Sequence, residues 1–277
     1  MPSIREKRAY TEQRLLLSVF RKMNERLSSR GANIMVMKAY FDVVKNLVSK
    51  IEETQSATIA RLAERIADSV EKDGVLHIFG SGHSHMIGED AFHRAGGLAC
   101  INAMLEESLM ETNSGRATVL ERLPGYAEVL MAGYDLRAGE VIVIISNSGI
   151  NAVPIEMAFA CKQKGLYVVA ITNLDHSKQV QSRHSSGKRL FEIADVVLDN
   201  CGVLGDAEIG LDGLEQKIGP TSTLSGVLIM QLLIAEITGI LQSRGITPPV
   251  FLSQNCSGGD EHNEKLVERY KGRVRYL

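Results

Sequence analysis

Residues 141–151, VIVIISNSGIN, carry the clearest signal of the fold of this chain. The first five residues, 141–145, are all β-branched and apolar, which predicts a strand buried on both faces of its sheet. The chain then turns polar, and a helical window follows at residues 152–164 with Pro154 in its first turn, where proline is well tolerated. We therefore expect a strand, a tight turn and a helix, the repeating unit of a parallel α/β sheet.

The same alternation of strand and helix patterns extends over most of the chain. Further short apolar runs lie at residues 75–79, 98–101, 166–171 and 196–198, and further helical windows lie at residues 86–95, 126–132 and 223–242. The last window is apolar nearly all round, which predicts a buried helix. Residues 40–70 also have helical apolar spacing, and residues 54–56 mark a point where this segment can break into a helical hairpin. These patterns predict the α/β class, with a parallel sheet covered by helices on both faces.

Polar turns follow two of the predicted strands, and a third polar cluster opens the last long helix. They consist of Gly80, Ser81, Gly82, His83 and Ser84; of Ser146, Asn147, Ser148, Gly149 and Asn151; and of Thr221, Ser222 and Thr223. Ligands of parallel sheets bind at the carboxyl ends of the strands, where a helix N-terminus offers free N–H groups and a favourable dipole to an anion. Each cluster alone is also explained by helix capping, but three of them predict one shared phosphate pocket.

The first turn does not fit a nucleotide-binding loop. The dinucleotide pattern requires a third glycine three residues after the second, and this chain has His85 there; no Walker lysine follows either. His85, Glu89 and His93 lie four residues apart on one helical face and could hold Zn²⁺. We interpret that spacing as a coincidence of the helix surface. We therefore expect no metal and no cofactor.

The loops at residues 80–84 and 146–151, together with residues 221–223, resemble those of the sugar isomerase (SIS) domain family. The resemblance extends from about Tyr40 to Arg244. It implies a five-stranded parallel sheet in a three-layer α/β/α sandwich, with phosphate bound by the serine-rich loop. It also implies a homodimer or homotetramer with its sites near the subunit interface. The expected organisation is a basic extension at residues 1–36, a SIS phosphosugar-binding domain at residues 37–247, and a tail with a short helix at residues 248–277.

The resemblance implies sugar phosphate chemistry, and three functions stay open. The chain looks closest to stand-alone bacterial phosphosugar isomerases or binding proteins, so a cofactor-independent aldose–ketose isomerase is the first. The others are an amino-sugar phosphate lyase or etherase, and a phosphosugar sensor without catalytic activity. Asn151 stands where the family usually has Thr, and Arg94 stands where the etherase and the heptose isomerase have an important Glu. The second departure argues against a direct transfer of either mechanism.

Four residues are candidates for the acid–base catalysis that isomerisation and elimination both require. Glu106 and Glu107 follow the second predicted strand, and Glu215 lies where the etherase resemblance places a carboxylate. His184 lies in a polar, basic stretch, residues 176–189, which we interpret as a lid over the sheet end. For each carboxylate a solvated surface position is the alternative, because Glu is seldom buried unless it is paired.

Composition and charge exclude several classes of protein. The chain has 277 residues and a net charge of −2, and its four cysteines have no CxxC spacing, as expected for reduced thiols in the cytoplasm. No apolar run reaches the roughly 18 residues of a membrane span. Residues 1–30 carry eight basic and three acidic groups, hence +5, but no interleaved aromatic pattern, so a nucleic-acid partner is not expected. We expect a solvated, partly helical extension there; the alternative is that translation begins at Met35 or Met37.

Overall fold

The computed structural model describes residues 36–277. The chain divides into two units, Met1–Val43 and Val44–Leu277, and the second contains the sheet. Apart from Val36, the basic extension predicted at residues 1–36 lies outside the described residues. The fold below is therefore that of the second unit, together with the helix that leads into it.

Helix α2, Val36–Val70, is continuous, and the predicted break into a hairpin is wrong. The polar residues at the expected break do not interrupt it, because two of their hydroxyls bond back to the helix. Thr54 Oγ1 donates to the carbonyl of Lys50 at 2.6 Å, and Ser56 Oγ donates to the carbonyl of Glu52 at 2.5 Å. Such bonds satisfy Ser and Thr within a helix at little cost to its continuity.

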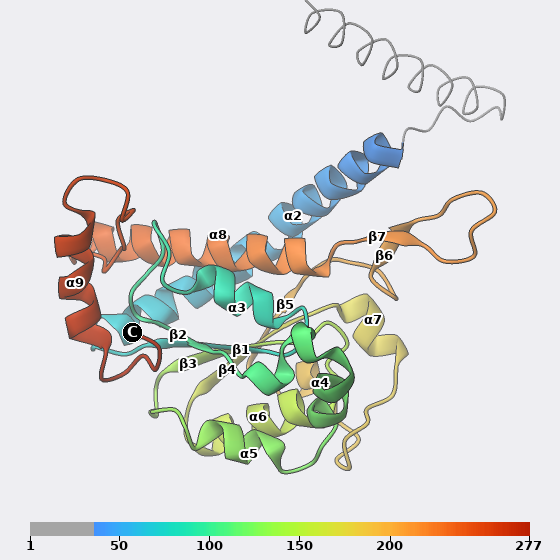
Figure 1. Cartoon of the computed structure of the whole chain (residues 1–277), viewed down its shortest axis with the longest axis horizontal. Coiled ribbons are helices and arrows are strands. Elements are labelled where there is room, and N and C mark those ends of the chain that lie inside the picture. The colour runs from blue at the N-terminus through green and yellow to red at the C-terminus, as the bar shows by residue number, and fades with distance from the viewer. Residues whose placement is uncertain (1–35) are drawn as a thin grey trace, which may run out of the picture. The chain divides into compact units, whose positions relative to one another are not determined.

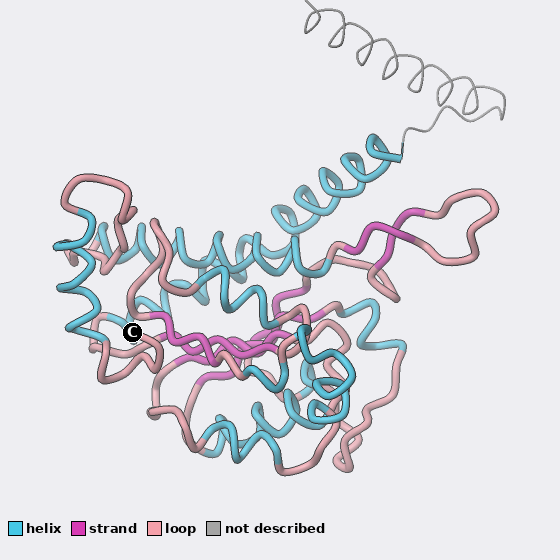
Figure 2. Tube along the Cα trace, in the orientation of Figure 1, coloured by secondary structure: helices cyan, strands magenta, loops and turns pink. Residues whose placement is uncertain are grey.

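Five parallel strands form the central sheet (Figure 2). They are β1 Leu76–Gly80, β2 Ile101–Met104, β3 Val141–Ile145, β4 Tyr167–Thr172 and β5 Val196–Asp199. Their order across the sheet is β2-β1-β3-β4-β5, and the register places Leu76 opposite Val141 and Gly80 opposite Ile145. The chain therefore builds the sheet in opposite directions from β1 and β3, which makes the carboxyl ends of these two strands the topological switch point.

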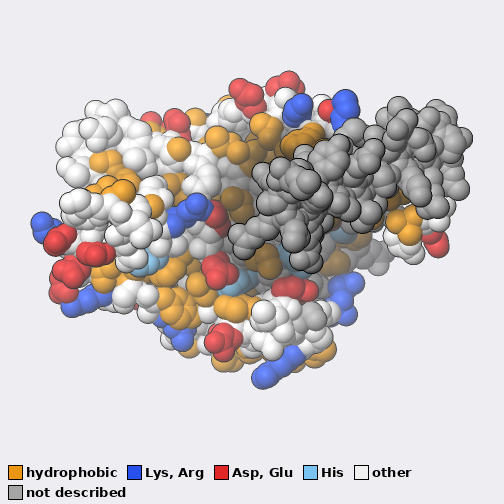
Figure 3. Space-filling model, turned by 45° about the horizontal axis from the view of Figure 1, so that its top comes forward, with side chains coloured by type: hydrophobic (Ala, Val, Ile, Leu, Met, Phe, Trp, Pro, Cys, Tyr) orange, Lys and Arg blue, Asp and Glu red, His pale blue; other side chains and the backbone are white. Residues whose placement is uncertain are grey.

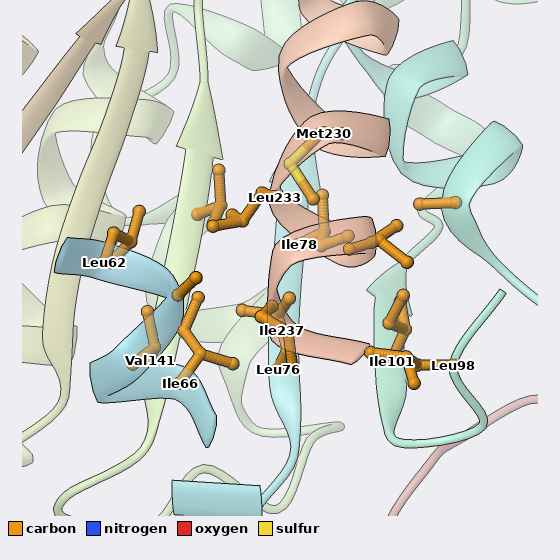
Figure 4. Close-up of a cluster of buried hydrophobic side chains, with 14 of the residues drawn as sticks. Leu62, Ile66, Leu76, Ile78, Leu98, Ile101, Val141, Met230, Leu233 and Ile237 are labelled. Atoms are coloured by element: carbon orange, nitrogen blue, oxygen red, sulfur yellow. The ribbon is translucent and has the colours of Figure 1, made fainter. Parts of the chain in front are cut away.

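One face of the sheet is covered by α2, by α3, His85–Ala91, and by α8, Ser222–Ser243 (Figure 1). Alternate strand residues point to this face because successive side chains of a strand lie on opposite sides. Figure 4 shows Leu76 and Ile78 of β1 among Leu62 of α2 and Leu233 and Ile237 of α8. All of these side chains are at most 2% exposed, so this layer is a dry apolar core.

The opposite face is covered by α4, Ser114–Glu121, by α5, Tyr126–Met131, and by α6, Ala152–Gln163. The intervening strand residues, such as Ile142 and Ile144, supply its core. Two layers of helices thus enclose the sheet, and the predicted three-layer α/β/α sandwich with a five-stranded parallel sheet is confirmed.

Several short elements depart from the sequence pattern. They are three 3₁₀ turns at Glu107–Leu109, Glu111–Asn113 and Leu190–Glu192, helix α7 at Leu174–Gln179, and a hairpin of β6, Ala207–Ile209, with β7, Ile218–Pro220. Strand β2 begins three residues later than expected, because Leu98 instead forms an antiparallel bridge with Val250 of the tail. The tail carries helix α9, Gly259–Tyr270.

Helix α8 is, within residues 36–277, the one helix long and apolar enough to cross a membrane by length and composition alone. Gln231 and Glu236 interrupt its apolar residues, so the prediction that no apolar run reaches about 18 residues is a different statement and is not contradicted. The apolar composition has another cause in this fold, because Ile229, Leu233 and Ile237 are fully buried against the sheet. Core helices of α/β proteins satisfy the same criterion.

Candidate functional site

A cavity of about 430 Å³ lies at the carboxyl ends of the strands, next to the switch point. Hydroxyl and amide groups, two carboxylates and two histidines form its wall. The lining residues are His83, Ser84, Glu121, Ser146, Asn147, Ser148, Asn151, His176, Asp206, Pro220, Ser222 and Thr223. All three predicted polar turns contribute, and none of these lining residues is Lys or Arg.

Glycine is required at two positions of the turn after β1. A Cβ on Gly80 would lie 2.5 Å from the carbonyl oxygen of Ser84, so the chain can double back there only without a side chain. Gly82 has φ of +56°, a left-handed conformation, and its N–H donates to the carbonyl of Leu109 at 2.7 Å. These constraints place Ser81 and His83 between β1 and α3, at the edge of the cavity.

The turn after β3 is held by bonds to its carbonyl groups. Thr172 Oγ1 and the N–H of Asn173 donate to the carbonyl of Asn147 at 3.1 and 3.0 Å. Because the C=O and N–H of one trans peptide point in opposite directions, the N–H of Ser148 faces away from β4. Within residues 36–277 that N–H has no assigned protein acceptor. It is therefore free to donate to an anion.

Gly149 completes this turn in a conformation that other residues adopt with strain. Its φ is +64°, its N–H donates to Ser146 Oγ at 3.2 Å, and an added Cβ would lie 3.1 Å from Cβ of Leu190. Ser146 is only 5% exposed, so its hydroxyl is fixed by the turn rather than by solvent. The serine-rich loop is thus preorganised before any ligand arrives.

Glu121, at the end of α4, connects the two turns, a role that no sequence motif indicates. Its Oε1 accepts from Ser81 Oγ at 2.7 Å, and its Oε2 accepts from Asn151 Nδ2 at 2.7 Å. Asn151 Oδ1 in turn accepts from Arg183 Nη1 at 2.9 Å. The side chain at 151 therefore uses a donor and an acceptor at once, which an amide provides on two separate atoms.

The N-terminus of α8 already holds a carboxylate of this chain. Asp206 Oδ1 accepts from the N–H groups of Thr221 and Ser222 at 3.0 and 2.8 Å, and its Oδ2 accepts from Ser222 Oγ at 2.8 Å. Asp206 has φ of +69°, an uncommon conformation that this cap stabilises. Of the three predicted phosphate-binding clusters, the one at residues 221–223 thus differs, because Asp206 occupies the anion position of its helix.

Comparisons with known proteins give the family. A model described as the SIS domain matches residues 39–173, a span that includes both strand-end turns and Glu121. A UPF0309 protein of Thermoanaerobacter pseudethanolicus is 46% identical over 243 residues, which are 86% of this chain and 98% of that protein. The chain belongs to the UPF0309 family of SIS-domain proteins. A UPF0309 protein of Listeria innocua is 41% identical over 239 residues, which are 86% of this chain and 97% of that protein.

Two solved structures share the fold of this SIS-domain protein. A phosphoheptose isomerase of Neisseria gonorrhoeae has a TM-score of 0.52 at 19% identity, over 73% of this chain and 97% of that one. A phosphoheptose isomerase of Francisella tularensis has a TM-score of 0.51 at 14% identity, over 74% of this chain and 98% of that one. At these identities the likeness establishes the SIS-type fold.

The four predicted catalytic residues do not line the cavity of the SIS domain. Glu106 accepts from Ser108 Oγ at 3.0 Å, and Glu107 is exposed, because the 3₁₀ turn after β2 diverts the chain from the sheet end. Glu215 is exposed in the loop that joins β6 and β7, and Figure 1 shows this hairpin projecting away from the sheet. These carboxylates follow a strand or a motif in the sequence, but the 3₁₀ turn and the hairpin direct them away from the cavity.

The basic segment predicted as a lid, residues 176–189, contributes His176 and Arg183 to the site instead of the expected His184. His184 packs against α6, with Nε2 at 3.6 Å from Oε1 of Glu156 and its ring 6.2 Å from that of Phe159. His176 lines the cavity instead, and its Nδ1 is buried without a hydrogen-bond partner within residues 36–277. Arg183 reaches the cavity edge through Asn151. The segment therefore contacts the site through one histidine and one arginine.

The histidines considered for zinc do not converge. His85 is 4% exposed with Nδ1 at 3.7 Å from Glu89, and burial lowers the pKa of His85. Helix α3 ends at Ala91, so His93 leaves the helical face and its ring packs on Phe251 at 4.7 Å. In the part of the chain that the structure describes, no group of three or more His, Cys, Asp or Glu residues is placed to hold a metal ion.

Proposed function

We propose that this protein binds a sugar phosphate in the cavity at the carboxyl ends of β1 and β3 and interconverts its aldose and ketose forms. One observation supports this most strongly: the two strand-end turns meet at the switch point, and a carboxylate, Glu121, lies between them. An anion site next to a general base is the arrangement that this reaction needs.

The phosphate would be bound by neutral donors. The hydroxyls of Ser146 and Ser148, the free N–H of Ser148 and the N-terminus of α6 surround one part of the cavity. Charge-assisted hydrogen bonds from such groups, with the helix dipole, suit a dianion without a lysine or arginine. Asp206 would repel the phosphate, so the sugar ring would lie toward α8, where a carboxylate can accept from sugar hydroxyls.

Glu121 is the base in this proposal. It would take the proton from C2 of the open aldose and return it to C1 of the enediol, while a second group moves a proton between the oxygens on C1 and C2. His176 is suited to that second role and to ring opening, because it lines the cavity and has an unsatisfied ring nitrogen. His83 is more exposed and lies 3.4 Å from Glu111, so it fits ligand binding better than proton transfer.

A sensor without turnover is the second candidate. Both carboxylate oxygens of Glu121 accept hydrogen bonds, so this side chain also fits a clamp that only holds the two turns together. Arg94 supports the same alternative: it pairs with Asp90 on the surface of α3 and does not line the cavity. A lyase acting on amino-sugar phosphates would use the same base and differs in its product.

The test is incubation of the full chain with a panel of pentose, hexose, heptose and amino-sugar phosphates in D₂O, followed by NMR. Deuterium incorporation at C1 or C2 with ketose formation is expected, whereas lactate release would indicate the lyase. Binding measured by calorimetry without exchange at either carbon would assign the sensor. Ser148→Ala should weaken binding about tenfold through the loss of a charge-assisted hydrogen bond, and Ser243→Ala, an exposed hydroxyl elsewhere, is the control.

We also propose a homodimer or homotetramer. The outer face of α8 exposes Leu224 (38%) and Leu232 (41%), eight residues apart on the same side of the helix. A second copy would cover these side chains, and light scattering after size exclusion tests the mass. Leu232→Glu should shift an oligomer toward smaller species, while an unchanged mass would show that this face is not the interface.

A cytoplasmic location and the absence of a nucleic-acid partner remain our proposals. All four cysteines are free, and three of them are buried, as suits a reducing compartment. On the face shown in Figure 3, Lys and Arg side chains lie singly among Asp and Glu rather than in one continuous basic surface. Gel-shift titration with duplex and single-stranded DNA tests the second proposal, and saturable binding at physiological salt would contradict it.

A further inference from the structure

A second cavity, of about 730 Å³, lies at the opposite end of the sheet from the sugar phosphate site. It is bounded by the end of α2, by the segments that lead into β1 and β3, and by α9. Figure 1 shows α9 at the far end of the sheet from α4 and α7, which flank the first site. We propose that this amino-end cavity binds a polyphosphate anion of the nucleoside di- or triphosphate class.

Positive charge dominates its lining. Five cationic side chains line it, namely Arg65, Lys72, Arg137, Arg269 and Arg273, against three acidic ones, Asp68, Asp73 and Glu140. The formal balance is therefore five minus three, or +2. Several guanidinium groups in one cavity favour phosphate oxygens, because the planar fork can bind two of them at once.

The acidic groups are already neutralised, and Arg137 pairs with Asp135, outside the lining, at 2.6 Å. Two of the five lining cations therefore stay free for a ligand. Asp73 pairs with Arg269 at 2.8 Å, and Glu140 pairs with Arg273 at 2.5 Å. Asp68 pairs at 2.8 Å with Arg244, a residue outside the cavity lining, so it uses none of the lining cations.

Arg65 and Lys72 have no carboxylate partner within residues 36–277. Arg65 lies over the ring of Tyr167 at 3.9 Å, a contact that orients its guanidinium and leaves its N–H donors available. Lys72 lies at the end of α2, two residues beyond its last helical residue, and is exposed. These two residues are the positive charge that an incoming anion would meet.

Tyr270 supplies an independent observation. It lines the cavity and is 2% exposed, yet its hydroxyl has no hydrogen-bond partner within residues 36–277. Buried hydroxyls are nearly always paired, so an unpaired one in a cavity wall marks a position where a ligand oxygen or a bridging water belongs. Desolvation also raises the pKa of Tyr270, so the group stays a neutral donor to an anion.

The floor of the cavity is rigid. Glu140 is 4% exposed, accepts from the N–H groups of Val75 and Arg137 at 3.1 and 3.0 Å, and contacts His77 at 2.9 Å. This carboxylate therefore fixes the starts of β1 and β3 against each other, and Arg273 with them. A preformed wall of this kind loses little entropy when a ligand binds.

The test is calorimetric titration of the full chain with ATP, ADP, pyrophosphate and inorganic phosphate at low salt. Saturable binding of ATP and pyrophosphate, tighter than that of phosphate, is expected. Equal affinities for ATP and pyrophosphate would show that the polyphosphate alone is recognised, and tighter binding of ATP would add the nucleoside; both support the site. Absence of saturable binding of all four would overturn the proposal.

Variants locate the ligand. Lys72→Glu and Arg65→Glu should each weaken binding at least about tenfold, whereas Lys265→Glu, the same charge change on the exposed face of α9, should change it less than about twofold. Tyr270→Phe removes only the unpaired hydroxyl and should weaken binding without lowering stability. Binding lost in Ser148→Ala but kept in Lys72→Glu would place the anion in the sugar phosphate cavity and contradict this one.

Discussion

The cavities at the two ends of the parallel sheet differ in the charge of their lining residues. At the carboxyl end, hydroxyls, amides and free N–H groups line a cavity without Lys or Arg, and its two carboxylates give it no positive charge. At the amino end, arginines and a lysine surround a larger cavity whose acids are paired. In our proposal both cavities bind anions, the first through preorganised dipoles at strand ends and the second through full charges.

The largest expected effect is the loss of turnover when the proposed base at the carboxyl end is removed. Glu121→Gln keeps the shape and the contact to Ser81 but cannot take a proton. If Glu121 is the base, turnover should fall by about 10²- to 10⁴-fold while the dissociation constant of the sugar phosphate changes only a few-fold. Steady-state kinetics and calorimetry measure the two effects. Glu107→Gln, on an exposed carboxylate outside the cavity, is the control and should leave both values unchanged.

At the amino end, the largest effect of a substitution should be on stability. Burial alone would raise the pKa of Glu140, but hydrogen bonds from His77 and Arg273 outweigh it and lower that pKa to about 2. Because the folded-state pKa is the lower one, the stabilisation is present above about pH 4.5 and is lost as pH falls toward 2. Glu140→Gln should therefore lower the free energy of unfolding at pH 7 by about 3 kcal/mol.

Denaturant unfolding between pH 2 and pH 7 measures this contribution. The wild-type protein should lose stability steeply over the acidic range, and Glu140→Gln should have a flatter profile there. Glu128→Gln, on an exposed carboxylate of α5, should keep the wild-type profile. Parallel profiles for the wild type and Glu140→Gln would show that the Glu140 pairings do not stabilise the fold.

Gly149→Ala tests the preorganised turn at the carboxyl end. The change imposes a strained φ and brings Cβ within 3.1 Å of Leu190, so unfolding should become easier by about 1–3 kcal/mol and sugar phosphate binding should weaken. Gly213→Ala, at φ of +79° in the hairpin loop with open space around it, has the strain without the contact. Thermal denaturation and calorimetry of both variants separate the two causes. Equal binding by both variants would show that the turn does not hold the phosphate.

The smallest expected effect is a difference between the two cavities in how ligand affinity depends on salt. Binding at the carboxyl end relies on dipoles at short range, so raising NaCl from 50 to 500 mM should change the sugar phosphate affinity by less than about threefold. Binding at the amino end relies on full, exposed charges and should weaken by more than about tenfold over the same range. Titrations of the two ligand classes at several salt concentrations provide the slopes, and similar slopes would remove the distinction.

The strands, the hydroxyl-bearing turns that follow them and the fold class were predictable because their sequence signals are local. Five β-branched residues at 141–145 predict a buried strand. The turn residues that follow must lie at its carboxyl end, where ligands of parallel sheets bind. Neighbouring elements with weak signals were missed. Helix α4 buries little beyond Ala117, so nothing in its sequence marked it as a helix or Glu121 as a cavity residue.

The polar contacts that define the site depend on residues far apart in the chain. Ser81 and Glu121 are 40 residues apart, and Asn151 and Arg183 are 32 apart, so no spacing rule connects them. Asp206 was missed for the same reason, since its role as the cap of α8 arises only when the hairpin folds back. Conversely, Glu215 and His184 have suitable chemistry and chain position but lie away from the cavity. Glu215 is in the loop of the same hairpin, and His184 packs on α6.

A crystal structure of the protein with a bound sugar phosphate from the NMR panel would show directly whether the two strand-end turns hold the phosphate. We expect phosphate oxygens within hydrogen-bond distance of the Ser146 and Ser148 hydroxyls and of the Ser148 N–H, with the sugar carbons C1 and C2 facing Glu121. A phosphate bound at the amino-end cavity, or one at the carboxyl end that contacts neither strand-end turn, would contradict this expectation.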